Sequence, residues 1–172
     1  MTDAPLLHAL AVETFPLACP PHLARADIDA YLQTTLSEES FRTMLYAPSH
    51  HLVIAEWGTE AAGWALVVEG APPPAIQQMV SGFPTLELSK FYVRQAGHGH
   101  GVAAVLMEWV LRTAASLGAM SVWLGVNSQN TRAGRFYDKH GFRVVGHKTF
   151  SVGSQLERDD VREKLLVPNV AP

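Results

Sequence analysis

The sequence has one cysteine, Cys19, so the chain can form no internal disulfide and no zinc site built from several cysteines. It has no apolar run near the roughly 20 residues of a membrane-spanning helix, and its N-terminus lacks a basic segment followed by an apolar core. Basic residues are not in excess, because 13 lysines and arginines stand against 16 aspartates and glutamates, and no basic stripe with interleaved aromatic residues is present. We therefore expect a cytoplasmic protein with no membrane partner and no nucleic-acid partner.

The chain has the size and composition of one folded domain. Its 172 residues are enough for one substantial core, 48% of them are hydrophobic, and there are no internal repeats or low-complexity tracts. We predict a single domain over residues 1–172. The pattern predicts a first strand at 6–14, helices at 26–34 and from Ser37, a hairpin of 51–57 with 63–69, and final strands at 143–150 and 158–167. Residues 70–84, with three consecutive prolines, are expected to form a long loop and a candidate wall over the functional site.

A glycine-rich turn is the most informative feature of the chain. Residues 86–93 are typical of a strand, and the run Gly97-His98-Gly99-His100-Gly101 joins it to a helix expected from Gly101 to about Leu117, with Gly118 as its cap. The unpaired backbone amides of a first helical turn, together with its partial positive charge, attract anions. Glycine lets the backbone approach such a ligand closely. The turn therefore predicts a phosphate site.

Two common nucleotide-binding motifs do not fit this turn. A Walker motif has lysine and then serine or threonine after its last glycine, whereas Val102 and Ala103 follow Gly101 here. A dinucleotide motif has an acidic residue about 20 residues further on, and no carboxylate occurs in residues 117–123. His98 and His100 do not indicate a metal, because no carboxylate or cysteine lies near them in the sequence to complete a coordination sphere. We predict no metal site.

A second motif follows a predicted strand at 121–126. It reads Asn130-x-x-Ala133-x-x-Phe136-Tyr137-x-x-x-Gly141-Phe142 and predicts a short helix closed by glycine. Together with the glycine turn, this motif resembles the GCN5-related N-acetyltransferase (GNAT) superfamily. The coenzyme A turn of that superfamily reads Gln or Arg, any, any, Gly, any, then Gly or Ala, and the six residues here are His98-Gly99-His100-Gly101-Val102-Ala103. The last two small positions match, whereas His98 stands where glutamine or arginine is usual.

The resemblance covers residues from about 14 to 166 and implies both a fold and a cosubstrate. The implied fold is the α/β GNAT fold, with a central, mostly antiparallel sheet whose central strands splay apart between flanking helices. The implied cosubstrate is acetyl-CoA, and one amide of residues 91–93 would polarise its thioester carbonyl. The residues that the resemblance assigns to acetyl-CoA are Phe91, Tyr92, Val93, His98, Gly99, His100, Gly101, Val102, Ala103, Asn130 and Tyr137. For Asn130, a plain helix N-cap is an equally good interpretation.

Direct attack of an amine on acetyl-CoA in a ternary complex needs two proton transfers. A protonated alkyl amine, with a pKa of about 10.4, must lose a proton before it attacks. Glu87 in the strand before the turn is the best-placed carboxylate for this role, although it could also be a solvated position on an alternating strand. Tyr137 could protonate the departing coenzyme A thiolate, or it could only pack beside Phe136.

The acceptor is predicted from local charge and from the nearest subgroup. Asp27, Asp29, Glu38 and Glu39 lie in the region that forms one acceptor wall in the superfamily. Residues 87–93, 122–126, 146–150 and 160–165 look like the corresponding segments of the bacterial PaiA-like polyamine acetyltransferases. We therefore predict a polyamine such as spermidine or spermine, although solvated helix faces would explain the same carboxylates.

Other interpretations of the same resemblance stay open. The acceptor could be another small amine, an amino acid or a protein amino group. A non-catalytic acyl-CoA-binding regulatory protein is a further alternative, against which the presence of both Glu87 and Tyr137 argues. The last strands often mediate dimers in this superfamily, so a homodimer is one expectation of the resemblance.

Overall fold

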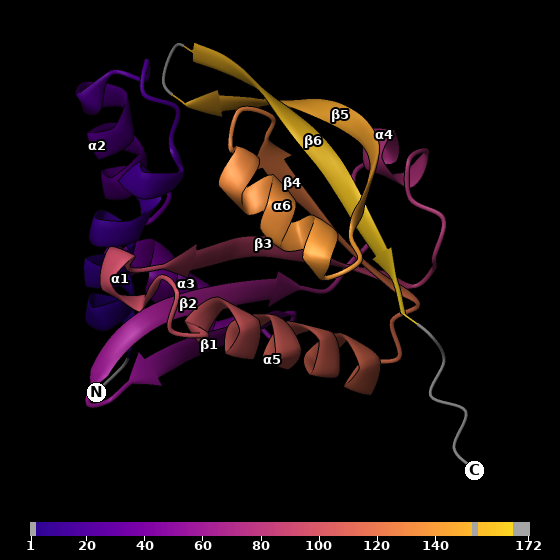
Figure 1. Ribbon diagram of the computed structural model, residues 1–172, viewed down its shortest axis with the longest axis horizontal. Coiled ribbons are helices and arrows are strands. Elements are labelled where there is room, and N and C mark those ends of the chain that lie inside the picture. The colour runs from indigo at the N-terminus through magenta and orange to yellow at the C-terminus, as the bar shows by residue number, and fades with distance from the viewer. Residues whose placement is uncertain (1–2, 153–154, 167–172) are drawn as a thin grey trace.

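The computed structural model describes residues 3–152 and 155–166 (Figure 1). Three helices precede the first strand, and the later helices lie between the strands of one sheet in chain order. The elements are α1 (Ala4–Ala18), α2 (Arg25–Thr34), α3 (Glu38–Tyr46), β1 (His50–Trp57), β2 (Glu60–Val68), α4 (Pro74–Gln77), β3 (Thr85–Val93), the 3₁₀ turn η1 (Gln95–Gly97), α5 (Val102–Ser116), β4 (Ser121–Asn127), α6 (Thr131–Lys139), β5 (Arg143–Val152) and β6 (Gln155–Leu165). Within the described residues, no helix combines the length and the apolar character needed to cross a membrane.

In the part of the chain that the structure describes, the sheet has six strands in the order β1-β2-β3-β4-β6-β5, and only the central pair β3–β4 is parallel. That pair is short, because its register runs only from Thr85 opposite Ser121 to Glu87 opposite Trp123. Beyond these residues β3 continues to Val93 and β4 to Asn127 without pairing to each other. The expected mixed sheet with splayed central strands and flanking helices is therefore confirmed.

The core lies on both faces of β2, because alternate side chains of a strand point to opposite faces of the sheet. Ala65 and Val67 pack in one apolar cluster with Val110 and other residues of α5. Trp64 and Leu66 belong to a second cluster that includes residues of α1, α2 and α3. Figure 1 shows α5 lying along the sheet and α1, α2 and α3 gathered at one end of it. Two helical layers thus fix β2 and the adjacent β3, which lines the site described below.

The first element differs from the expectation. Residues 6–14 were predicted to form a strand, but they belong to the helix α1. The buried residues of this segment recur with helical spacing, at Ala4, Leu7, Leu10, Ala11, Thr14 and Phe15. The short apolar run could not distinguish a strand from a buried helix, and packing against β2 decides for the helix.

The other predicted helices and strands are present, although some of them begin earlier than expected. Ser37 caps α3, since its hydroxyl oxygen accepts a hydrogen bond from the amide of Ser40 at 3.1 Å. The hairpin β1–β2 is present, and its second strand starts at Glu60, three residues earlier than expected. The predicted loop at 70–84 contains the short helix α4. The last predicted strand is β6, which begins at Gln155, earlier than expected; the final residue of the prediction, 167, lies outside the described residues.

Candidate active site

The glycine turn opens α5 with an arrangement suited to an anion. Gly99 and Gly101 have φ angles of +81° and +82°, a left-handed conformation that favours glycine. An added Cβ at either position would meet nothing within 4 Å, so both backbones face open space. Among the described residues, no group accepts a hydrogen bond from the amides of Val102, Ala103 or Ala104 in the first turn of α5. The turn therefore presents free amide donors to whatever lies above it.

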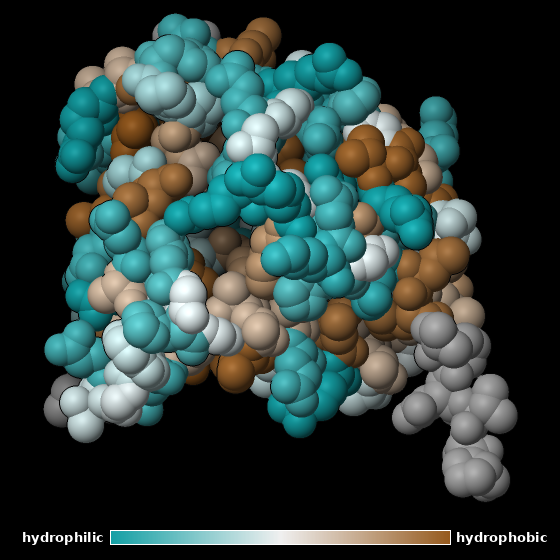
Figure 2. Space-filling view, viewed as in Figure 1, coloured by the Kyte–Doolittle hydropathy of each residue, from teal (hydrophilic) through white to brown (hydrophobic). Residues whose placement is uncertain are grey.

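A cavity of about 370 Å³, here called the donor cavity, extends from this turn toward β3. Small residues of the turn and of α5 form one part of its lining. Phe91, Tyr92 and Tyr137 form another part. Figure 2 shows a hollow on the same face of the molecule, with apolar and pale residues on its floor and hydrophilic residues around it. The residues that line the donor cavity are Thr14, Leu17, Ala18, Phe91, Tyr92, Val93, Gly97, His98, Gly99, Gly101, Ala103, Ala104, Asn130, Arg132, Ala133, Phe136 and Tyr137.

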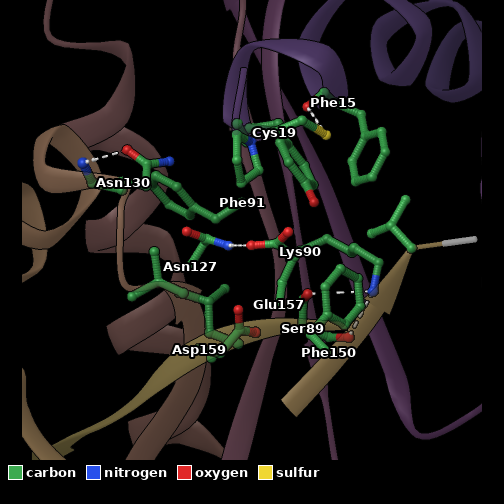
Figure 3. Close-up of a pocket in the computed structure, with 18 of the residues that line it drawn as sticks. Phe15, Cys19, Ser89, Lys90, Phe91, Asn127, Asn130, Phe150, Glu157 and Asp159 are labelled. Carbon is green, nitrogen blue, oxygen red and sulfur yellow. Dashed lines mark hydrogen bonds between the residues drawn. The ribbon is translucent and has the colours of Figure 1, made fainter. Parts of the chain in front are cut away.

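A second cavity, of about 250 Å³, adjoins the first and is here called the acceptor cavity (Figure 3). It lies where β3 and β4 have separated, and it is bounded by the end of α1, by β3 and β4, and by β5 and β6. The two cavities share lining residues, among them Phe91, Asn130 and Tyr137. A ligand in one cavity would therefore meet a ligand in the other at Tyr137.

Tyr137 is held at this junction by aromatic packing and by α6. It is 7% exposed, and its ring packs edge-on against those of Phe91, Phe136 and Phe142 at centroid distances of 6.2, 5.5 and 5.7 Å. Burial raises its pKa well above the usual value for a phenol, and the nearby Arg162 guanidinium only partly opposes this. Its hydroxyl forms no hydrogen bond with the residues that the structure describes. At neutral pH Tyr137 is thus a protonated phenol that is free to donate.

The acceptor cavity contains carboxylates on two strands. Glu87 of β3 lines it and is partly buried. Glu157 of β6 is 6% exposed and accepts hydrogen bonds from His22 Nε2 at 2.6 Å and from Asn127 Nδ2 at 3.0 Å. These two donors hold the pKa of the Glu157 carboxyl below its usual value, so this group is ionised at neutral pH. The third carboxylate, Asp159, is also 6% exposed, and burial raises its pKa to about 6.

The same cavity also contains two lysines. Lys90 of β3 is bonded by its ammonium to the carbonyl of Ser89 at 3.3 Å and to the Ser89 hydroxyl at 3.2 Å. Burial lowers the pKa of Lys90, while the charge of Glu87 opposes this shift and that of Lys148 adds to it. Lys148 of β5 places its ammonium 5.6 Å from the centroid of the Trp123 ring. The acceptor cavity is therefore polar and holds charges of both signs.

The comparison with known proteins now decides the family. Residues 9–142 match the profile of the Acetyltransferase (GNAT) family. The chain belongs to this family. An uncharacterized N-acetyltransferase of Mycobacterium tuberculosis is 41% identical over 167 residues, which cover 97% of this chain and 100% of that protein. The protein is an acetyl-CoA-dependent N-acetyltransferase.

Two solved structures show the same fold. The PaiA N-acetyltransferase of Thermoplasma acidophilum, crystallised with coenzyme A, superposes with a TM-score of 0.76 at 18% identity, covering 95% of this chain and 93% of that one. The ribosomal-protein-S18-alanine N-acetyltransferase of Escherichia coli gives a TM-score of 0.66 at 14% identity, covering 99% and 94% of the two chains. At these identities the comparison establishes the GNAT fold and does not distinguish between acceptors.

The residues predicted for acetyl-CoA fall into two groups in this acetyltransferase. Most of them line the donor cavity, namely Phe91, Tyr92, Val93, His98, Gly99, Gly101, Ala103, Asn130 and Tyr137. The Val102 side chain is instead buried in the core at 5% exposure, so only its amide can face a ligand. His100 stacks on Trp57 with ring centroids 4.0 Å apart and lines neither of the two cavities.

His98 does more than replace the usual glutamine or arginine. Its Nε2 lies 3.1 Å from the carbonyl oxygen of Val93, and its Nδ1 lies 3.0 Å from a guanidinium nitrogen of Arg132. Burial and the charge of Arg132 lower the pKa of His98, which favours the neutral ring with Nε2 donating and Nδ1 accepting. His98 therefore connects the end of β3 to the start of α6.

In residues 3–152 and 155–166, no group of three or more histidine, cysteine, aspartate or glutamate side chains could hold a metal ion.

The predicted acidic wall of the acceptor site is wrong. None of Asp27, Asp29, Glu38 and Glu39 lines either of the two cavities. Asp29 pairs with Arg25 at 2.8 Å, and Arg42 reaches Glu38 at 3.0 Å and Glu39 at 3.1 Å, all between neighbouring turns of their own helices. These carboxylates lie on solvated helix faces. Glu157 and Asp159 line the acceptor cavity instead. Their alternate positions along β6 are the sequence feature that could have indicated two carboxylates on one face of a strand.

The predicted loop wall over the site is also wrong. Residues 70–84 line neither the donor cavity nor the acceptor cavity. Ile76 and Val80 pack against Trp123 and Val161 at a different part of the sheet. The amides of Ser81 and Gly82 donate to the Glu163 carboxylate, each at 2.9 Å. The loop is thus fixed over β4 and β6 by apolar packing and a bonded carboxylate, away from the cavities.

Proposed function

We propose that this acetyltransferase transfers the acetyl group directly from acetyl-CoA in the donor cavity to a primary amine in the acceptor cavity. The observation that carries the proposal is the junction of the two cavities, which share Phe91, Asn130 and Tyr137. A ternary complex in which the two substrates meet at one phenol fits this arrangement. Holding both substrates in one site also removes much of the entropic cost of the reaction.

The residues of the donor cavity suit acetyl-CoA. The open backbone of Gly99 and Gly101 and the free amides at the start of α5 would hold its pyrophosphate. On β3, residues 91–93 pair with β2 on one side only, because β4 has separated from them on the other. Their outward backbone groups are thus available to the pantetheine arm and to the thioester carbonyl. Acetyl-CoA supplies the acetyl group, and the protein supplies its position.

Tyr137 is our candidate for the general acid. It is protonated at neutral pH and lies at the junction, so it can give its proton to the coenzyme A sulfur as the C–S bond breaks. Glu87 is the proton acceptor that the sequence suggests, and it lines the acceptor cavity as this role requires. Asn130 accepts a hydrogen bond from the amide of Ala133 at 3.1 Å as the N-cap of α6 while also lining both cavities. Its place in both cavities supports a contact with acetyl-CoA in addition to the N-cap bond.

For the acceptor we propose a polyamine such as spermidine or spermine. Three carboxylates in the acceptor cavity, Glu87, Glu157 and Asp159, support a cationic substrate. Glu157 is ionised and fixed in place by two hydrogen bonds, which makes it a suitable partner for an ammonium group.

Lys90 and Lys148 support a second candidate, an amine that also carries a carboxylate, such as an amino acid or a peptide. In this case the amino group would lie near the carboxylates and the anionic group near the lysines. A polyamine would gain nothing from the two lysines, whereas a zwitterion would be attracted by both kinds of charge.

Steady-state release of free coenzyme A from acetyl-CoA tests this function against a panel of spermidine, spermine, amino acids and short peptides. Saturable release with spermidine or spermine, and little with the others, supports the polyamine. Turnover confined to amino acids or peptides would replace it with the zwitterionic acceptor. Absence of turnover with every amine would contradict the proposal.

A further inference from the structure

Asp159 is a buried carboxylate without a partner. It is 6% exposed and lines the acceptor cavity, yet its oxygens form no hydrogen bond or ion pair within residues 3–152 and 155–166 (Figure 3). Burying a charged group without donors is unfavourable, so such groups are normally paired. Glu157, two residues earlier on the same face of β6, shows the normal case with its two donors. Asp159 thus leaves an acceptor open toward the cavity.

The two residues opposite Asp159 explain why it has no partner. Lys148 is directly opposite on β5, but its ammonium is held over the Trp123 ring and does not come within ion-pair distance of the carboxylate. Asn127 is directly opposite on β4, but its side-chain amide donates to Glu157. Gly125 carries no side chain, and a Cβ there would lie 3.2 Å from Asp159 Oδ2 and overlap Lys148. The donors of Lys148 and Asn127 are therefore directed away from Asp159, and Gly125 leaves space beside its carboxylate.

We propose that Asp159 binds the ammonium group of the acceptor and takes its proton, so that Asp159 rather than Glu87 is the general base. The inference rests on the proposed function and names a residue for one of its steps. A substrate ammonium would bring the donors that Asp159 lacks. Glu87, in contrast, lies where β3 is still paired with β4, and its charge acts on Lys90.

The electrostatics around Asp159 suit a base at physiological pH. Burial raises its pKa to about 6; the charge of Lys148 opposes this, and Asp160 and Glu157 add to it. Asp159 in turn acts on two nearby tyrosines, which are neutral because burial raises the pKa of Tyr31 to about 12 and that of Tyr92 well above its usual value. A carboxylate with this pKa is largely ionised at pH 7.5 and is a better proton acceptor than an ordinary carboxylate.

Each acetyl transfer releases one proton. Asp159 takes one proton from the ammonium, and the free amine attacks the acetyl carbonyl as the C–N bond forms. The C–S bond breaks, and the sulfur takes the hydroxyl proton of Tyr137. The second proton leaving the nitrogen restores Tyr137, and Asp159 releases its proton to solvent. The products are the N-acetylated amine, coenzyme A thiol and one proton.

Asp159→Asn tests the proposal, because it keeps the shape of the side chain and removes the basic oxygen. We expect kcat/KM for the best amine of the panel to fall about 100-fold or more, the range for a general base. The acid limb of the wild-type pH profile, with a midpoint near pH 6, should disappear in this variant. Acetyl-CoA affinity, measured by calorimetry, should stay the same. Asp29→Asn is the matched control, since Asp29 pairs with Arg25 at 2.8 Å and lines neither the donor cavity nor the acceptor cavity.

A thermal unfolding series gives a readout that does not depend on turnover. Because the folded-state pKa of Asp159 is raised, its charge destabilises the fold above about pH 6, and this effect is lost as the pH falls through that value. Asp159→Asn should therefore raise Tm at pH 7.5 and leave it unchanged near pH 4. A lower Tm at both pH values would indicate a merely structural carboxylate and overturn the proposal.

The outcomes separate this inference from the function on which it rests. If Asp159→Asn keeps its kcat/KM while Glu87→Gln loses it, Glu87 is the base and the Asp159 assignment is wrong. If the wild-type protein acetylates no amine, the proposed function fails, and the assignment of a base fails with it.

Discussion

Arg162 of β6 donates a hydrogen bond from Nη1 to Asp138 Oδ1 of α6 at 2.6 Å. The same nitrogen lies 3.3 Å from the carbonyl oxygen of Gly134, one turn earlier on that helix. Arg162 is 7% exposed, whereas the Asp138 side chain is mostly solvated. Since α6 carries Tyr137, this contact connects the last strand of the sheet to the candidate general acid.

We expect Arg162→Ala to lower both stability and activity. The loss of the bonds to Gly134 and Asp138 and of buried packing should reduce the free energy of unfolding by about 2 kcal/mol. The value of kcat should also fall, because α6 is less firmly held. Denaturant unfolding measures the change in stability, and steady-state kinetics measures the change in kcat. Asp138→Ala removes only the exposed partner and should cost less than about 1 kcal/mol. An equal loss in both variants would mean that the carboxylate, not the buried guanidinium, holds the helix.

Tyr137→Phe should lower kcat by about 100-fold, the scale of one proton transfer, while acetyl-CoA affinity stays close to that of the wild type. The hydroxyl has no hydrogen-bond partner in the described part of the chain, so Tm should change little. Tyr46→Phe removes the hydroxyl of a tyrosine that is 76% exposed and serves as the control. Near-normal kcat in Tyr137→Phe would show that the phenol only packs.

Gly101→Ala should raise KM for acetyl-CoA by about tenfold or more, because the new methyl group would stand where the backbone must approach phosphate. The left-handed φ of +82° adds a cost of about 1 kcal/mol in stability for any residue with a Cβ. Gly58→Ala is a close control, since Gly58 has a φ of +67°, equally open surroundings and no position in either of the two cavities. We expect similar destabilisation in the two variants and a raised KM only in Gly101→Ala. An unchanged KM in both would place the phosphate elsewhere.

Glu157→Gln should weaken amine binding. The change removes the fixed negative charge, so KM for spermidine should rise about fivefold or more. Glu69→Gln is the control, because Glu69 also pairs with a histidine, His51 at 2.8 Å, but lines neither of the two cavities. If both variants bind spermidine as the wild type does, Glu157 is not part of the acceptor site.

The segments that line the donor cavity could be recognised in the sequence because each of them is contiguous. The glycine turn, the start of α5 and the motif from Asn130 to Phe142 each fold locally, and the resemblance to the GNAT superfamily predicted that they share one site. The GNAT fold followed from these motifs and is confirmed.

The acceptor side could not be predicted in the same way, because it depends on pairing between distant strands. Glu157 and Asp159 reach the cavity only because β6 inserts between β4 and β5. The acidic residues near Asp29 and Glu38 carried a stronger local charge signal, yet the helices turn them to solvent. The apolar run at 6–14 likewise had no local feature to separate strand from helix, and only packing against β2 made it α1.

The most direct test of the account is the initial-velocity pattern with acetyl-CoA and the amine varied together. Direct transfer between adjoining cavities predicts intersecting double-reciprocal lines. Cys19 lines the acceptor cavity and is the obvious nucleophile for a covalent route, but burial raises its pKa to about 11, so it stays a weakly nucleophilic thiol. Parallel lines would indicate an acetyl-enzyme intermediate and would contradict direct transfer at Tyr137.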